Sequence, residues 1–249
     1  MSPSRTDRIV DVRGLSVGWG DVVLLEDVTF HVERGEIFAI LGGSGSGKST
    51  LMRYLVGLAR PDKGEVDVAG HGVPDLDRGL PPFGVMFQAG ALFGSMTVAE
   101  NVALPLEEWT DLPTDAIDAI VRAKLRLVGL EAAGAKFPAE ISGGMKKRAA
   151  IARALALDPE LLFLDEPSAG LDPVTTAEID ELLLTLNRAA ALTFVIVTHE
   201  LESVVHVARR CILLDKEART VVASGDPREL RRSPDERVSG FFNPKAVEV

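Results

Sequence analysis

The chain has 249 residues, of which 46% are hydrophobic and 26% charged, the composition of an ordinary globular protein long enough to bury a sizeable core. Its formal net charge of -10 at pH 7 argues against a nucleic-acid partner, because a phosphate backbone favours a basic surface. The single cysteine, Cys211, excludes an internal disulfide and lies in an apolar run, so we interpret it as a buried core thiol.

Short apolar segments separated by turn residues characterise the beginning of the chain. Strand-like runs occupy residues 9–12, 22–25 and 28–32. The turn residues that punctuate them are Gly18, Gly20, Asp21 and Gly35. This part of the chain is therefore predicted to form β structure.

A glycine-rich segment follows between a predicted strand at residues 37–41 and a predicted helix at residues 51–56. It fits the pattern G-x-x-x-x-G-K-[ST], the loop that wraps nucleotide phosphates with inward-pointing N–H groups at a helix N-terminus. We predict that this loop binds a nucleoside triphosphate through Gly42, Gly43, Ser44, Gly45, Ser46, Gly47, Lys48, Ser49 and Thr50.

Two other interpretations of this loop are weaker. A plain glycine-rich turn leaves the flanking strand and helix unexplained, and a dinucleotide fingerprint would need glycine where Lys48 stands. Lys48 is instead predicted to reach the β- and γ-phosphates, and the Ser49 hydroxyl to ligate Mg²⁺.

Helices and strands alternate along the rest of the chain. Residues 97–136 are predicted to be mostly helical, because Val98, Val102 and Leu106 recur at a spacing of four and a second helix begins at Pro113. The other predicted strands are residues 64–70, 84–87, 161–164, 193–197 and 210–214, and the other predicted helices are residues 143–157, 173–189 and 200–208. This order predicts an α/β fold with a mostly parallel sheet covered by helices on both faces.

Two acidic residues, Asp165 and Glu166, end the apolar strand 161–164. In phosphate-loop enzymes an aspartate at such a strand end holds Mg²⁺ directly or through water. Glu166 would then lie beside the γ-phosphate, where it could orient and deprotonate an attacking water. The alternative is that the pair caps a helix.

A second possible anion-binding helix start lies at Ser142, Gly143 and Gly144. It is either a helix cap or a site that grips the nucleotide held by a second copy of the chain. With these residues in hand, the chain resembles the nucleotide-binding subunits of ABC transporters over nearly its whole length. The three residues match the family signature, although Ile141 and Met145 stand where the family more often has leucine and glutamine.

The resemblance implies a RecA-like phosphate-loop core with a mostly parallel sheet, an N-terminal antiparallel β subdomain and an α-helical insert. It implies a single nucleotide-binding domain across residues 1–249. The β subdomain and core would cover about 8–90 and 141–225, the helical subdomain about 91–140 and a C-terminal tail about 226–249. That tail is charged and then apolar, at Phe241 and Phe242, and is interpreted as an appendage that docks on a partner protomer or packs onto its own domain.

Further site residues follow from the resemblance. Trp19 matches the aromatic residue that stacks on adenine, the alternative being a core aromatic. Gln88 matches the glutamine that senses Mg²⁺ and the attacking water, and otherwise is a surface loop residue. His199 matches the histidine that contacts the γ-phosphate, and a zinc motif H-E-x-x-H fails at Ser203. Residues 168–172 match the loop that crosses the dimer interface.

The resemblance also implies a mechanism, in which two copies close head to tail around two ATP molecules with Mg²⁺ and reopen on hydrolysis. The proposed catalytic residues are Glu166, His199, Gln88 and Lys48, and the proposed metal ligands are Ser49, Gln88 and Asp165. Residues 189–197, the longest apolar-leaning stretch, are far fewer than the ~20 that a membrane helix needs, so other subunits would supply the spanning helices.

Within the family, residues 87–93, 141–148 and 165–173 resemble the Mla and Mce-associated ATPases, which energise the movement of phospholipids or other lipids between bacterial envelope membranes. This implies membrane permease subunits and an Mce-domain lipid-binding protein as partners, at the cytoplasmic face of the inner membrane. The alternatives are an ATPase for an amino-acid or other small-solute importer, a soluble ABC ATPase acting on DNA or ribosomes, and a nucleotide-binding regulator without turnover.

Overall fold

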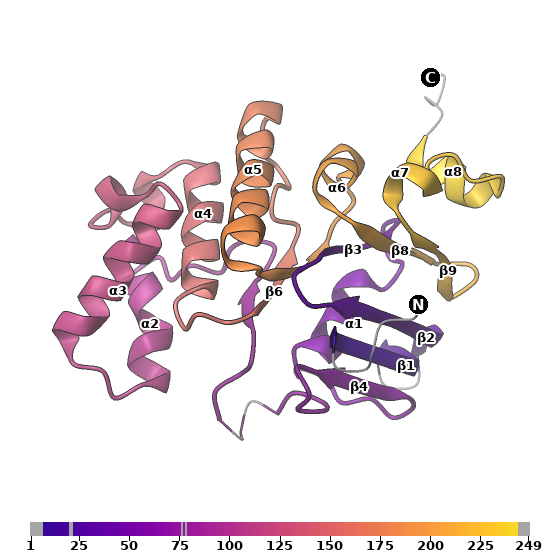
Figure 1. Ribbon diagram of the computed structural model, residues 1–249, viewed down its shortest axis with the longest axis horizontal. Coiled ribbons are helices and arrows are strands. Elements are labelled where there is room, and N and C mark those ends of the chain that lie inside the picture. Colours follow the sequence, from indigo (N-terminus) through magenta and orange to yellow (C-terminus); the bar gives the residue numbers. More distant parts are fainter. Residues whose placement is uncertain (1–6, 20–21, 76, 78, 244–249) are drawn as a thin grey trace. The chain divides into compact units, whose positions relative to one another are not determined.

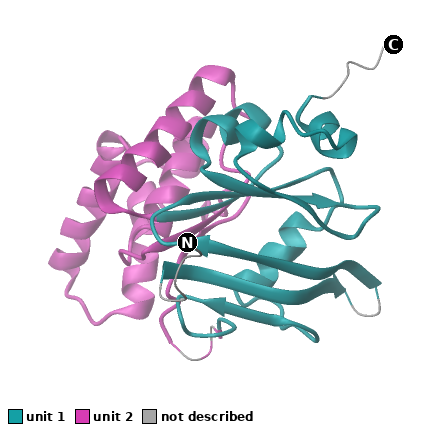
Figure 2. Ribbon diagram, turned by 45° about the vertical axis from the view of Figure 1, so that its right-hand side comes forward, with its two compact units in different colours: residues 1–74, 193–249 teal, residues 75–192 magenta. Residues whose placement is uncertain are grey.

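The computed structural model describes residues 7–19, 22–75, 77 and 79–243 (Figure 1). Two predicted turn residues, Gly20 and Asp21, and the last six residues of the predicted tail lie outside the described residues. The chain divides into two compact units (Figure 2). Unit 1 comprises residues 1–74 and 193–249, and unit 2 comprises residues 75–192.

Unit 1 contains an antiparallel sheet and a mostly parallel one. The antiparallel sheet has the order β2-β1-β4, formed by β1 (Arg8–Trp19), β2 (Val22–Glu33) and β4 (Glu65–Val68). The strands of the other sheet run in the order β7-β3-β8-β9, formed by β3 (Ile37–Gly42), β7 (Thr193–Val197), β8 (Arg210–Asp215) and β9 (Thr220–Gly225). Strand β3 is parallel to β7 and β8, and only β9 runs antiparallel to its neighbour. The helices of this unit are α1 (Lys48–Leu55), α6 (Leu201–Val207), α7 (Pro227–Leu230) and α8 (Glu236–Phe242).

Unit 2 combines a parallel strand pair with four long helices. The pair is formed by β5 (Gly84–Met86) and β6 (Leu161–Asp165). The helices are α2 (Val98–Trp109), α3 (Thr114–Leu127), α4 (Gly143–Ala154) and α5 (Pro173–Ala190), with 3₁₀ turns at Glu131–Ala133 and Pro138–Glu140. The predicted α/β fold, with a mostly parallel sheet, an antiparallel β region and helices, is confirmed.

Periodicity correctly located the buried faces. Val98, Val102 and Leu106 are at most 2% exposed along one side of α2, whose first turn is closed by a capping box between Thr97 and Glu100. Strands β3, β6 and β7 are buried at every residue, as expected for parallel strands covered on both faces. No helix in the described residues is both long enough and apolar enough to cross a membrane.

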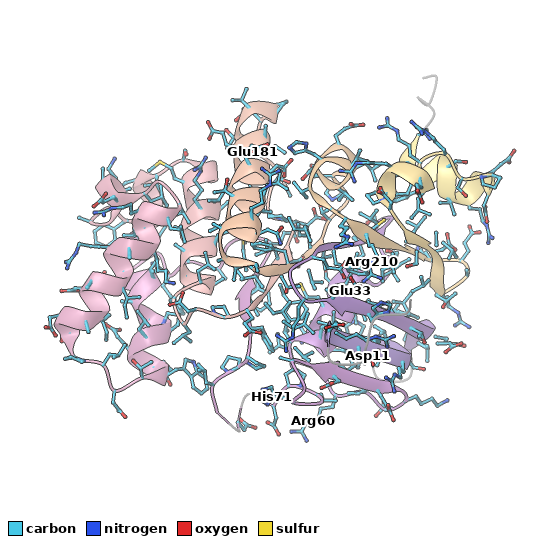
Figure 3. All side chains as sticks on the ribbon, in the orientation of Figure 1. Asp11, Glu33, Arg60, His71, Glu181 and Arg210 are labelled. Atoms are coloured by element: carbon cyan, nitrogen blue, oxygen red, sulfur yellow. The ribbon has the colours of Figure 1, made fainter. Side chains whose placement is uncertain are left out.

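An ion pair to a buried carboxylate fixes the start of β8 in unit 1. Two nitrogens of the Arg210 guanidinium, labelled in Figure 3, donate to the two carboxylate oxygens of Glu36, Nη2 to Oε1 at 2.6 Å and Nε to Oε2 at 3.0 Å. Arg210 also donates to the carbonyl of His31 at the end of β2. This two-point geometry is the strong form of an arginine–carboxylate contact, and it ties three strand ends together.

Helix α8, within the C-terminal tail, contributes to the core of unit 1. Val238 and Phe242 of α8 are 2% and 3% exposed, in one apolar cluster with Leu41 of β3 and Cys211 of β8. Of the two alternatives for the tail, packing onto its own domain is the one that holds for α8. A seven-residue helix is too short for its apolar spacing to be recognised in the sequence. Cys211 is the buried thiol that we expected, and burial raises its pKa to about 12.

We expect Phe242→Ala to lower the free energy of unfolding by about 3–5 kcal/mol, because it opens a cavity in this cluster. Denaturant unfolding followed by circular dichroism measures the loss. The matched control is Phe241→Ala, which removes a ring that is only partly buried and should cost clearly less. A loss that depends on protein concentration would instead mean that Phe242 docks on a second copy.

Candidate functional site

The predicted phosphate loop connects β3 to α1 within unit 1. Gly47 is the N-cap residue of α1 and has a left-handed φ of 92°, which residues with a Cβ rarely adopt. A Cβ at this position would also lie 3.1 Å from Cδ1 of Leu25. The exposed residues Gly43, Ser44 and Gly45 precede this turn. The chain therefore makes the strand–loop–helix connection that the motif requires.

Two side chains of the loop fit an anionic ligand. The ammonium of Lys48 bridges the loop, donating to the carbonyls of Gly42 at 2.8 Å and Gly43 at 3.1 Å. The Ser46 hydroxyl is buried and has no hydrogen-bond partner among the described residues. A buried hydroxyl without a partner needs an explanation, and a phosphate oxygen would provide an acceptor for it. The residues present therefore fit the phosphates of a nucleotide.

His199 follows the strand beside the phosphate loop. The parallel register pairs Ile40 of β3 with Val197 of β7, and the N–H of Thr198 donates to the Ile40 carbonyl at 3.3 Å. Because neighbouring parallel strands end at the same edge of a sheet, the exposed His199 and the phosphate loop emerge at one edge.

Trp19 lies at the end of β1 and is not a core aromatic, since 52% of it is exposed. Its indole N–H donates to the Thr50 hydroxyl at 3.3 Å, which connects it to the phosphate loop. The Arg53 guanidinium lies 4.7 Å from the ring centroid. The structure thus contradicts the core alternative and leaves a partly open ring beside the loop.

In unit 2, Asp165 and Glu166 stand at the end of β6, and both are buried. The helix-cap alternative is wrong, because α5 begins only at Pro173 and its N-cap is Asp172, whose carboxylate accepts the N–H groups of Val174 and Thr175. Glu166 itself has a left-handed φ of 50°. Backbone strain of this kind concentrates at functional sites.

Gln88 occupies a tight turn after β5. The N–H of Gly90 donates to the carbonyl of Phe87 at 2.6 Å, so Gln88 and Ala89 are the two central residues. Gln88 is exposed. Helix α4 holds the turn, since Arg153 donates to the carbonyls of Gly90 and Ala91, both at 2.7 Å.

The predicted signature residues begin α4. Ser142 is the N-cap, and its hydroxyl accepts the N–H of Met145 at 3.3 Å. Gly143 and Gly144 form the first turn. Ser142 therefore does cap its own helix. It is also exposed, so the second interpretation, contact with a nucleotide on another copy, stays a prediction.

The predicted residues fall into two groups, one in each unit. Unit 1 brings together the phosphate loop, Trp19 and His199. Unit 2 joins Gln88 to Glu166 through a residue that we did not predict, Lys147, which donates to both of their backbone carbonyls. Its only sequence signal is a basic residue one turn into a predicted helix, which usually indicates a solvated face.

Comparison with known proteins places these features in a family. The family model described as "ABC transporter" matches residues 25–169. The chain is 40% identical over 241 residues to the "Intermembrane phospholipid transport system ATP-binding protein MlaF" of Escherichia coli strain K12, covering 94% of this chain and 88% of that protein.

Two further similarities are informative. The "Probable ribonucleotide transport ATP-binding protein mkl" of Mycobacterium leprae is 44% identical over 205 residues, which are 80% of this chain and 58% of that protein. Among solved structures, a dimeric ATP-binding cassette in a post-hydrolysis state, bound to ADP and Pi, is 30% identical with a TM-score of 0.77. That match covers 88% of this chain and 99% of the cassette.

We expect Trp19→Ala to weaken ATP binding roughly 5- to 150-fold, because base–aromatic stacking contributes about 1–3 kcal/mol. Trp19→Phe keeps a ring and should retain most of the affinity. Calorimetric titration of each variant with ATP measures the effect.

The chain offers a matched control, because it contains only two tryptophans. Trp109, which is 38% exposed on α2, should be replaceable by alanine without changing affinity. Equal affinities for wild type and Trp19→Ala would rule out stacking.

Proposed function

Because the chain belongs to the ABC transporter family and is an ATPase, we propose that it drives the movement of phospholipid, or another lipid, across or between bacterial envelope membranes. The observation that supports this cargo most is the 40% identity to MlaF, which extends over 94% of the chain. The resemblance at residues 87–93, 141–148 and 165–173 points to the same cargo.

The phosphate loop is the proposed nucleotide site. Residues 42–50 would hold the phosphates of ATP, with Lys48 exchanging its carbonyl partners for phosphate oxygens. Trp19 would stack on the adenine. Ser49, Gln88 and Asp165 offer the oxygen ligands that Mg²⁺ prefers. When bound, the ion would neutralise part of the phosphate charge.

Hydrolysis is assigned to four residues, of which Lys48 would hold the β- and γ-phosphates. Glu166 would accept a proton from the attacking water while the water oxygen forms a bond to the γ-phosphorus. The bond between the γ-phosphorus and the oxygen that bridges to the β-phosphate would break, leaving ADP. Gln88 would orient that water, and His199 would donate a hydrogen bond to the γ-phosphate. The burial and strained backbone of Glu166 support a functional role.

Two copies would work together. Ser142, Gly143 and Gly144 of one copy would contact the ATP held by the other, so that ATP favours a closed dimer that hydrolysis reopens. The similarity to a cassette whose structure is dimeric with ADP and Pi supports this arrangement.

The proposed membrane partner is a separate permease at the cytoplasmic face of the inner membrane, with an Mce-domain protein as a further partner. Residues 88–101 would contact the permease. Phe87, which immediately precedes this segment, and Phe93, within it, are 39% and 53% exposed, which supports an apolar contact there.

A small-solute importer is the second candidate. The observation behind this candidate is the printed name of mkl, which refers to ribonucleotide transport. The nucleotide chemistry would be the same in both cases, because cargo is selected by the membrane subunits.

We expect Glu166→Gln to reduce kcat for ATP hydrolysis by about 100-fold or more, since a positioned general base contributes roughly 10²–10⁴. ATP affinity should change little, so the variant should accumulate as an ATP-bound dimer. Phosphate release and light scattering with ATP measure the two effects.

Glu108→Gln on α2 is the control, since it also exchanges a carboxylate for an amide but at an exposed helix position. It should behave as wild type. Normal turnover by Glu166→Gln would exclude Glu166 as the base.

The cargo is tested by purifying the tagged chain from native membranes in mild detergent and identifying bound proteins and lipids by mass spectrometry. We expect a permease, an Mce-domain protein and phospholipid. A different permease with no lipid-binding partner would contradict the lipid assignment and leave the ATPase assignment intact.

A further inference from the structure

Helix α4 carries a buried cation directed at two backbone carbonyls. Lys147 is 8% exposed, and its ammonium donates to the carbonyl of Gln88 at 2.6 Å and to that of Glu166 at 2.7 Å. All three residues belong to unit 2. A lysine this buried is rare unless its charge is used, and here its hydrogen bonds join two segments that are 78 residues apart in the chain (166 − 88).

Each acceptor belongs to a residue with a proposed role in hydrolysis. Glu166 has a left-handed φ of 50°, and its carbonyl also accepts the N–H of Ala169 at 3.3 Å. A non-glycine residue keeps such a backbone only where its surroundings hold it. Gln88 begins the central part of the turn that is closed by Gly90. Lys147 thus donates to the backbone carbonyl of each of the two residues whose side chains are assigned to hydrolysis.

The lysine itself projects from a fixed support. Arg153, two turns further along α4, binds the carbonyls of Gly90 and Ala91. At Gly84, the first residue of β5, a Cβ would lie 2.0 Å from the carbonyl oxygen of Ala154, so strand and helix approach as closely as glycine allows. The C-terminal end of α4 is therefore held against the turn and β5, and Lys147 extends from this anchored helix to the carbonyls of the turn and the strand end.

Burial lowers the pKa of Lys147, while the nearby carboxylates of Glu166 and Asp165 raise it. A buried ammonium close to these acids also offsets part of their mutual repulsion.

We propose that Lys147 is a positioning residue for ATP hydrolysis, which joins the backbones of Gln88 and Glu166 so that the two side chains keep a productive geometry. The inference rests on the proposed roles of these two residues. In this role Lys147 acts through the two backbone carbonyls to which its ammonium donates. Its loss should lower turnover and leave ATP binding nearly intact, because Lys147 is not among the residues that we propose to hold the nucleotide.

Lys147→Met keeps the length and apolar stem of the side chain and removes the donors. We expect kcat to fall about 10- to 100-fold, because small misplacements of catalytic groups have effects of this size. The KM for ATP should stay within about threefold of wild type, since no ATP contact is removed. Lys147→Arg restores donors of sufficient reach and should recover most of the lost turnover.

Lys124→Met is the matched control. Lys124 is also 8% exposed and lies in the same unit, but it pairs with the Asp158 carboxylate. Its replacement should lower the melting temperature without lowering kcat. Unchanged kcat in Lys147→Met, or an equal loss in the Met and Arg variants at wild-type melting temperature, would overturn the proposal. If Lys147→Met does not fold, Lys147→Gln tests the proposal through the same measurements of kcat and KM, because its shorter side chain cannot reach both carbonyls.

Measuring Glu166→Gln in the same assay distinguishes a failure of the proposed hydrolytic roles from a failure of the positioning role of Lys147. If it turns over ATP normally, the assigned roles fail. If it is slow while Lys147→Met is as fast as wild type, only the positioning role fails.

Discussion

Complete burial of the parallel strands is the constraint on which the rest of this structure depends. Strands β3, β6 and β7 have no exposed residue, so they cannot carry polar chemistry along their length. Polar groups can appear only where the strands end, and there the chain places the phosphate loop, Asp165 with Glu166, and His199. The apolar packing that stabilises the fold therefore also decides where chemistry is possible.

The segments that follow the buried strands contain residues with unusual backbone conformations. Gly47 and Glu166 both have a positive φ, and the first needs a residue without a Cβ. Lysine ammonium groups donate hydrogen bonds to backbone carbonyls in these two segments. Lys48 binds those of the phosphate loop, and Lys147 binds those of Gln88 and Glu166. Since each ammonium has three donors and no acceptor, lysine suits this task better than a hydroxyl or an amide.

Much of the fold was predictable because its signals are local. The apolar runs that became β3, β6 and β7 and the spacing of Val98, Val102 and Leu106 need no knowledge of distant residues. For the tail, the sequence left docking on a partner protomer and packing onto its own domain both open. Helix α8 has too few apolar positions to form a recognisable periodicity. Its residues Val238 and Phe242 are buried because residues from β3 and β8 pack against them.

The sequence by itself determined the order of elements, the phosphate loop, the acidic strand end and the family, because each is encoded by neighbouring residues. Only the tertiary structure decided that Trp19 is open, that Ser142 caps its helix and that Asp172 caps α5. It also decided that Lys147, which in the sequence is one of three consecutive basic residues, is the one that turns inward to Gln88 and Glu166. The physical reason is that burial and hydrogen bonds between distant segments exist only once the chain has packed.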